Sequence, residues 1–179
     1  LDLGKVATVG DAIPADSARE VVDARGLIVT PGLIDLHVNS YWGASTYGID
    51  PDVSNLAKGV TTALDAGSAG ALTFPAFRRH TIDTADTRLY ALLNISAMGM
   101  VSPKIGELED LRWADVELAV ESGRKNRDRV LGIKARLGRH LLGESSAVEA
   151  LKRAIEAAEG FDGFVMIHVG ASPSPLPKL

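Results

Sequence analysis

The chain contains no cysteine among its 179 residues. Disulfide bonds are therefore excluded, and so are metal sites built on thiolates. Any metal ion bound by this chain must be held by nitrogen and oxygen ligands. The residue types to consider are its four histidines, its carboxylates, its side-chain amides and its lysines.

Long apolar runs and a strong charge of either sign are also lacking. No stretch approaches the roughly 18 to 20 apolar residues of a membrane span, and the opening LDLGKVATVG lacks the basic and then apolar layout of a secretory signal. The net charge of -4, from 19 basic and 23 acidic residues mixed along the chain, provides no basic surface for nucleic acid or an anionic membrane. We expect a cytoplasmic protein whose partner is a small molecule, and the composition is compatible with a homo-oligomer.

Apolar residues make up 46% of the chain, enough for one sizeable hydrophobic core. The first thirty residues contain three short β-type segments punctuated by glycines, namely LGKVATVG, REVVDARG and LIVTPG. We interpret residues 1–31 as part of a small β-sandwich domain. A boundary near residues 30–32 then separates it from a second domain at residues 32–179.

From Leu33 onward, short apolar strands alternate with amphipathic helices, which indicates βα units and a parallel sheet. The predicted strands are Leu33–Val38, Val60–Asp65, Arg88–Asn94, Val130–Arg136 and Phe164–Val169. The predicted helices are Pro51–Lys58, Thr73–Ile82, Leu111–Asn126 and Ser145–Glu159. Asp110 is the expected cap of the third helix, and Ser145 or Ser146 caps the fourth, where Glu149 closes a capping box.

Five strands in about 140 residues correspond to a repeat near 30 residues, which is the length of one βα unit in a (β/α)₈ barrel of about 250 residues. Five barrel strands leave an open parallel edge and exposed apolar faces. The expected fold class is α/β, as a partial TIM barrel of about five βα units preceded by part of a β-sandwich. We interpret the sequence as a part of a longer polypeptide.

Reactive side chains of a parallel barrel gather at the carboxyl ends of its strands. The polar residues at those ends are, in chain order, Asp35, His37, Asn39, Asp65, Asn94, Lys134, Arg136 and His168. Because side chains alternate along a strand, Asp35, His37 and Asn39 share one face. The other histidines, His80 and His140, fall in helix ends or loops and are expected on the solvated surface.

Lys134 lies within the strand segment GIKAR, where an ammonium facing the barrel interior is costly to desolvate. Three explanations are open: Asp65 as a counter-charge, a depressed pKa that makes the lysine a neutral nucleophile, or carboxylation by CO₂ to a carbamate that bridges two divalent cations. A lone His37 or His168 is more often a hydrogen-bonding residue than a ligand. The functional interpretation depends on both histidines lying with Lys134 at the same face of the predicted sheet.

The motifs PGLIDLHVN, YGIDPD, GVTTALDAGSAGA, GIKARL and VMIHVG follow one another in the order typical of the amidohydrolase superfamily, and the chain resembles its dihydroorotase-like and deacetylase-like metallohydrolases. The resemblance implies one or two divalent ions, with zinc as the first expectation. It implies that His37 and Asn39 bind the more buried ion, that Lys134 is the bridging carbamate of the catalytic centre, and that His168 binds the more exposed ion. A metal-activated hydroxide would then attack the carbonyl of an amide or ester.

Two positions depart from the family pattern. Asn39 stands where the HxH motif has its second histidine, and an amide oxygen is a weaker zinc ligand than imidazole, so we predict a weakened buried metal site. Tyr41 stands where dihydroorotases carry an arginine that holds a substrate carboxylate. This counts against dihydroorotase itself, and the run YGIDPD and the GSAGA loop resemble the deacetylase-like branch more closely, whose substrates are acylated amino or hydroxy acids. We predict that Tyr41 and Arg136 bind the substrate.

The function that the resemblance implies is hydrolysis of an amide or ester bond in a small acylated substrate. The family also places a histidine on strand six and an aspartate on strand eight, which the given residues do not include, so the piece alone is expected to be inactive. Two alternatives stay open. One is a non-catalytic dihydroorotase-like scaffold that has lost metal binding, and the other is a barrel that uses Lys134 as a Schiff-base nucleophile.

Overall fold

The computed structural model describes residues 5–11 and 13–179 and divides the chain into two compact units, Leu1–Pro31 and Gly32–Leu179. The described residues of the first unit form one 3₁₀ turn, Ala15–Ser17, and contribute no strand to a sheet. The three β-type segments predicted there are therefore not paired strands in the described residues; the first of them begins at residues 3 and 4, which lie outside that part. The assignment of this unit to a β-sandwich stays a prediction.

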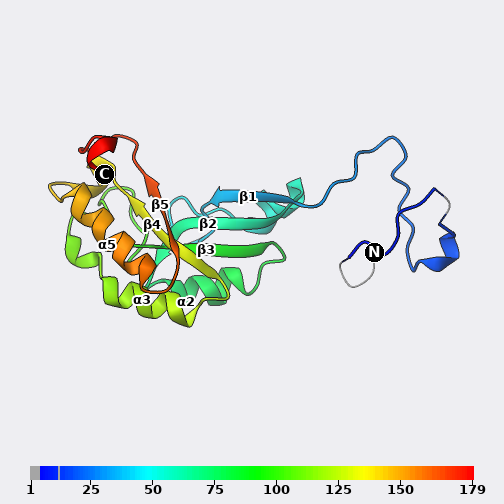
Figure 1. Cartoon of the computed structure of the whole chain (residues 1–179), viewed down its shortest axis with the longest axis horizontal. Coiled ribbons are helices and arrows are strands. Elements are labelled where there is room, and N and C mark those ends of the chain that lie inside the picture. Colours follow the sequence, from blue (N-terminus) through cyan, green and yellow to red (C-terminus); the bar gives the residue numbers. More distant parts are fainter. Residues whose placement is uncertain (1–4, 12) are drawn as a thin grey trace. The chain divides into compact units, whose positions relative to one another are not determined.

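Five parallel strands form one sheet in the second unit, in the order β1-β2-β3-β4-β5 (Figure 1). The strands are β1 Leu33–Val38, β2 Val60–Gly70, β3 Arg88–Asn94, β4 Val130–Arg136 and β5 Phe164–His168. Each strand pairs in parallel with the next one along the chain, and the sheet curls into half of a barrel. The predicted α/β class and the partial TIM barrel are thereby confirmed.

Strand β2 continues well beyond the predicted end at Asp65, to Gly70, and this extension is wholly buried. Serine and glycine in the segment GSAG suggest a loop when the sequence is considered alone. Here the small residues allow another backbone to come close: a Cβ built on Gly70 would lie 1.9 Å from the carbonyl oxygen of Ser96. The extension therefore packs directly against the segment that follows β3.

The helices are shorter than predicted because several predicted ranges break into a helix and a tighter or wider turn. The α-helices are α1 Pro51–Ser54, α2 Phe74–Phe77, α3 Val116–Lys125, α4 Arg139–Leu142 and α5 Ala147–Glu159. The remaining turns are η2 Leu56–Lys58, η3 Arg78–Ile82, η4 Leu111–Trp113 and η5 Leu176–Lys178. Helix α4 was not predicted. No helix of the described residues is long and apolar enough to cross a membrane.

The helix caps differ in part from the prediction. Asp110 caps only the short turn η4, and α3 begins after Asp115, whose carboxylate accepts a hydrogen bond from the Leu118 N–H. Ser146 caps α5 by accepting from the Glu149 N–H at 3.2 Å, as predicted. The carboxylate of Glu149 does not close a capping box; it binds Arg153 one turn further on.

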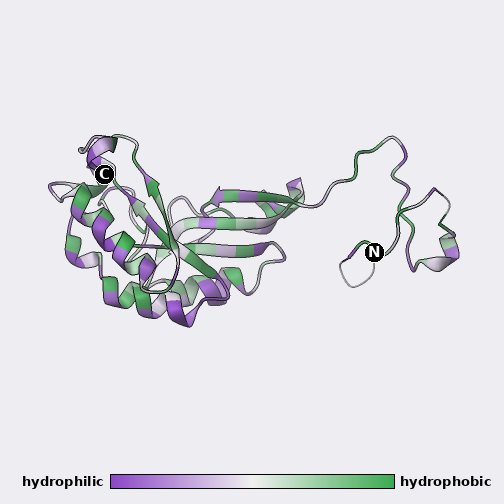
Figure 2. Cartoon of the chain, in the orientation of Figure 1, coloured by the Kyte–Doolittle hydropathy of each residue, from purple (hydrophilic) through white to green (hydrophobic). Residues whose placement is uncertain are grey.

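Helices α2, α3 and α5 cover one face of the sheet (Figure 1), and the hydrophobic core lies between them and the strands. The helices alternate between hydrophobic and hydrophilic residues along their length (Figure 2), as expected when one side of each helix packs on a sheet. Ile133 and Ala135 of β4 belong to this core. Because side chains alternate along a strand, Lys134 and Arg136 face the opposite, concave side.

Candidate active site

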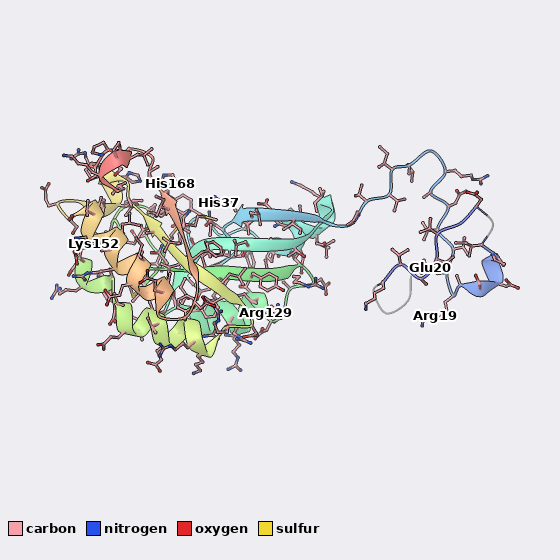
Figure 3. All side chains as sticks on the ribbon, in the orientation of Figure 1. Arg19, Glu20, His37, Arg129, Lys152 and His168 are labelled. Carbon is pink, nitrogen blue, oxygen red and sulfur yellow. The ribbon has the colours of Figure 1, made fainter. Side chains whose placement is uncertain are left out.

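The structure brings His37, Lys134 and His168 to the same end of the sheet. The register of the strands pairs Lys134 with Asn94 of β3, and Arg136 with His168 of β5. His37 and His168 lie at the carboxyl ends of β1 and β5, on the same side of the sheet (Figure 3). Burial is the main cause of a lowered pKa at His168, and the charges of Lys134 and His37 add to it, so both side chains lie near His168.

Lys134 is buried, with only 1% of its surface exposed. Gly67, at a φ of +85°, provides the room for its stem, since a Cβ built there would lie 2.5 Å from the Lys134 Cβ. Among the described residues no hydrogen bond or ion pair joins the Lys134 Nζ to another group. Burial, followed by the neighbouring charge of Arg136, lowers the pKa of the Lys134 amine. The fraction of neutral amine, which is the form that reacts with CO₂, is therefore larger than for an exposed lysine.

Asp65 is not the counter-charge of Lys134, which corrects one of the sequence-based explanations. It pairs in register with Ala91, a core residue, and so faces the helices and not the concave side. Its carboxylate accepts from the backbone N–H of Ser40 at 2.6 Å and of Ser68 at 2.7 Å, and from both serine hydroxyls. Burial raises the pKa of Asp65, and these four hydrogen bonds oppose the rise.

Burial also lowers the pKa of both histidines at the strand ends, and the nearby Lys134 charge lowers it further. For His37 the carboxylates of Asp35 and Asp65 act in the opposite direction without cancelling the shift. The lowered pKa favours the uncharged form of both imidazoles, in which each offers a nitrogen lone pair. Uncharged imidazole is the form that binds a metal ion.

Arg136 is held by two residues that the sequence did not identify as functional. Glu107 accepts from its Nε at 2.5 Å and from its Nη2 at 2.7 Å, and the Tyr47 ring lies 5.6 Å from the guanidinium carbon. The two side chains of the ion pair are 14% and 4% exposed, for Arg136 and Glu107 respectively. The remaining guanidinium N–H groups are left to bind an anion, so the predicted substrate-binding role of Arg136 stays open.

Glu107 comes from the loop between β3 and η4, where no spacing or motif singles it out. Tyr47 belongs to the YGID segment, which was noted as a family element without a role for any residue. Only the fold places both at the end of β4. Asn94 also comes close, with its Nδ2 at 3.5 Å from the Glu107 Oε1.

Tyr41 does not face the strand ends, which corrects its predicted role in substrate binding. Its ring is 8% exposed and lies 4.8 Å from the ring of Phe77, between ring centres. The hydroxyl donates to the Thr73 carbonyl oxygen at 3.4 Å. Tyr41 is therefore a core residue. His80 and His140 are exposed, as predicted.

The strand ends carry several side chains whose nitrogen or oxygen atoms could bind a metal ion. No group of three or more histidine, aspartate or glutamate side chains comes together as a metal site in the described part of the chain. The donors that do share one end of the sheet are His37, His168, Lys134 and Asn39. Lysine becomes an anionic oxygen ligand once its amine is a carbamate, and the lowered pKa of the amine on the buried Lys134 side chain suits that conversion. With the carbamate included, the set fits a divalent ion.

Comparison with known sequences finds relatives over nearly the whole chain, although no family model matches it. The chain is 34% identical to Deacetylase Atu3266 of Agrobacterium fabrum over 96% of its length, and 32% identical to a deacetylase of Enterococcus faecalis over 98%. A dihydroorotase of Geotalea daltonii is 26% identical over 92% of the chain. The matches cover 42%, 47% and 36% of these relatives, so the chain spans less than half of their length.

Two solved structures share the fold. The crystal structure of a dihydroorotase superposes on 95% of the chain with a TM-score of 0.85 and 33% identity, which covers 45% of that protein. The crystal structure of an adenine deaminase superposes on 82% of the chain with a TM-score of 0.73 and 32% identity, which covers 38% of that protein. A dihydroorotase is therefore among the similar proteins in both comparisons.

Proposed function

Because the chain is similar to deacetylases and dihydroorotases, we propose that it belongs to the amidohydrolase superfamily and supplies part of the active site of a metal-dependent hydrolase. The reaction is cleavage of an amide or ester bond in a small acylated amino or hydroxy acid. The observation that carries this proposal is the buried Lys134, which has no anionic partner among the described residues and lies at the same end of the sheet as His37 and His168.

His37, His168, Asn39 and the carbamate of Lys134 would hold the metal, with zinc as the first candidate for the imidazole ligands. A divalent ion there would lower the pKa of a water molecule and polarise the substrate carbonyl. The contribution of Lys134 begins with its neutral amine, whose nitrogen forms a bond to the carbon of CO₂ and releases one proton. The product is a carbamate with one negative charge, which offsets the charge of the cation.

Arg136 would bind the carboxylate of the acylated acid through the N–H groups that Glu107 leaves unused. Glu107 fixes the orientation of the guanidinium, and Tyr47 covers one of its faces. An anchor that is already oriented loses less conformational entropy when the substrate binds. The proposed substrate therefore carries both an acyl group, which would lie at the metal, and a carboxylate, which would bind Arg136.

The test uses the full-length polypeptide that carries this chain. Metal content is measured by mass spectrometry, and deacetylation is assayed on N-acetyl amino acids and O-acetyl hydroxy acids. Lys134→Met keeps the length of the side chain without its amine, and it should lose both metal and turnover. Lys152→Met removes an exposed lysine on α5 and should change neither. Wild-type protein that binds no metal and hydrolyses none of these substrates would contradict the proposal and favour the non-catalytic scaffold, which Asn39 also suggests.

A further inference from the structure

We infer that Asn39 presents its side-chain oxygen to the metal site, with Ser68 as the positioning residue. The resulting set of nitrogen and oxygen donors accepts oxygen-preferring ions such as Mn²⁺, whereas a second imidazole in place of the amide would select zinc. This inference rests on the proposed function, since it concerns the same metal site. It concerns the ion that the site accepts, and it can fail while the hydrolase proposal holds.

The first step is the hydrogen-bond network beneath Asn39. Asp65 and Ser68 are both fully buried. The Ser68 Oγ lies 2.7 Å from the Asp65 Oδ2 and 3.4 Å from the Asn39 Oδ1. The Asp65 Oδ2 accepts from the Ser40 N–H and from the Ser40 and Ser68 hydroxyls, and the Asp65 Oδ1 accepts from the Ser68 N–H. These four donors favour the carboxylate form of Asp65, against the effect of burial, which raises its pKa. The single hydroxyl proton of Ser68 therefore goes to Asp65.

The second step concerns the orientation of the Asn39 amide. With the Ser68 proton committed to Asp65, two oxygen atoms would face each other across 3.4 Å without a hydrogen between them. The amide oxygen and nitrogen are nearly alike in shape, so a half-turn of the amide group moves no other atom. After that turn the Asn39 NH₂ donates to the Ser68 oxygen. The side-chain carbonyl oxygen then points away from Ser68.

The third step is the chemistry of the exposed donor. Asn39 is the first residue after β1, and its partner Ser68 follows Gly67, which contacts the stem of Lys134, so the Asn39 amide lies at the same end of the sheet as Lys134. The site thus combines an imidazole nitrogen with a neutral carbonyl oxygen. Imidazole suits zinc, whereas carbonyl and carboxylate oxygens suit Mn²⁺ and Mg²⁺. Replacing one imidazole by an amide oxygen therefore reduces the difference in binding affinity between zinc and Mn²⁺.

The experiment measures the dissociation constants of MnCl₂ and ZnCl₂ with metal-free, full-length protein. The electron paramagnetic resonance signal of free Mn²⁺ reports binding of manganese, and competition against it reports binding of zinc, so the measurement does not depend on turnover. Asn39→His should favour zinc over Mn²⁺ by at least about tenfold relative to wild type. An unchanged ratio would overturn the inference while leaving the proposed function intact. Binding of neither ion to any variant would overturn both.

Ser68 is tested by a cycle of two substitutions. Ser68→Ala should weaken Mn²⁺ binding by about tenfold to a hundredfold, as removal of a group that orients a ligand commonly does. In an Asn39→Asp background the same change should have little effect, because a carboxylate offers an oxygen in either orientation. An equal loss in both backgrounds would show that Ser68 supports the fold and does not orient Asn39, and would overturn the role given to it.

Discussion

Gly67 is in direct contact with the stem of Lys134, because a Cβ built on the glycine would lie 2.5 Å from the Lys134 Cβ and 2.7 Å from its Cγ. The φ of +85° at Gly67 lies in the left-handed region that favours glycine. Strand β2 therefore bends where the lysine needs space. The sequence alone suggests that the GSAG segment is a loop, whereas in the structure it packs against the stem of Lys134.

Gly67→Ala should displace Lys134 and reduce the metal content of the full-length protein. Gly59 provides a matched control, because its φ of +87° is almost the same and nothing lies within 4 Å of a Cβ built there. Both variants carry the cost of a positive φ, about 1 kcal/mol, and only Gly67→Ala adds overpacking of about 1–3 kcal/mol. Urea denaturation gives the two free energies of unfolding. Equal losses, with metal retained in both, would rule out the proposed contact.

Glu107→Gln should destabilise the protein by about 3–5 kcal/mol, because it leaves the largely buried Arg136 without its anionic partner. It should also raise KM for carboxylate substrates more than it lowers kcat, since the anchor loses its fixed orientation. The exposed pair of Asp110 and Arg112 serves as the control, and Asp110→Asn should leave the melting temperature unchanged. Equal effects of the two substitutions would argue against a special role for Glu107.

Asp52 gives a prediction about pH. Burial raises the pKa of this carboxyl, but hydrogen bonds from the Thr87 N–H and hydroxyl and from the Asp86 N–H outweigh it, and the net shift is downward from 3.8. A pKa that is lower in the folded state adds stability above the unfolded value, and this stability is lost as the pH falls below it.

Asp52→Asn should therefore melt at a lower temperature than wild type at pH 7, and the difference should shrink as the pH falls from about 5 to about 2. Differential scanning calorimetry at a series of pH values measures this. Asp86→Asn is the control, since the exposed Asp86 side chain accepts no hydrogen bond from a described residue. A difference between Asp52→Asn and wild type that stays constant with pH would contradict the assignment.

The two tyrosines near the first loop should behave differently. Tyr41→Phe removes only a long hydrogen bond in the core and should leave KM unchanged, whereas Tyr41→Ala should cost about 3–5 kcal/mol of stability. Tyr47→Leu should leave stability nearly unchanged and raise KM, because the aromatic face over Arg136 is lost. Steady-state kinetics and thermal melting of the same samples separate the two roles, and a higher KM for Tyr41→Phe would return Tyr41 to the substrate site.

The strands could be predicted closely because each is a short apolar run with its own local signal. Arg88–Asn94 and Val130–Arg136 have the predicted ends, whereas β2 continues five residues beyond its predicted end at Asp65, through a glycine-containing segment that packs closely in the fold. Helix ends were less predictable because several polar residues compete to cap them. Asp110 and Asp115 both cap, and only packing decides which of the two begins a regular helix.

For the site, the sequence alone determined which chemistry is available: no thiolate, two histidines and a lysine at predicted strand ends, and an asparagine in the place of a histidine. These follow from residue type and from the alternation of a strand. Tertiary structure decided which groups meet. It turned Asp65 and Tyr41 toward the helices, and it brought Glu107 and Tyr47 to Arg136 from separate loops. Such contacts depend on the curvature of the sheet and the paths of its loops, which no local pattern encodes.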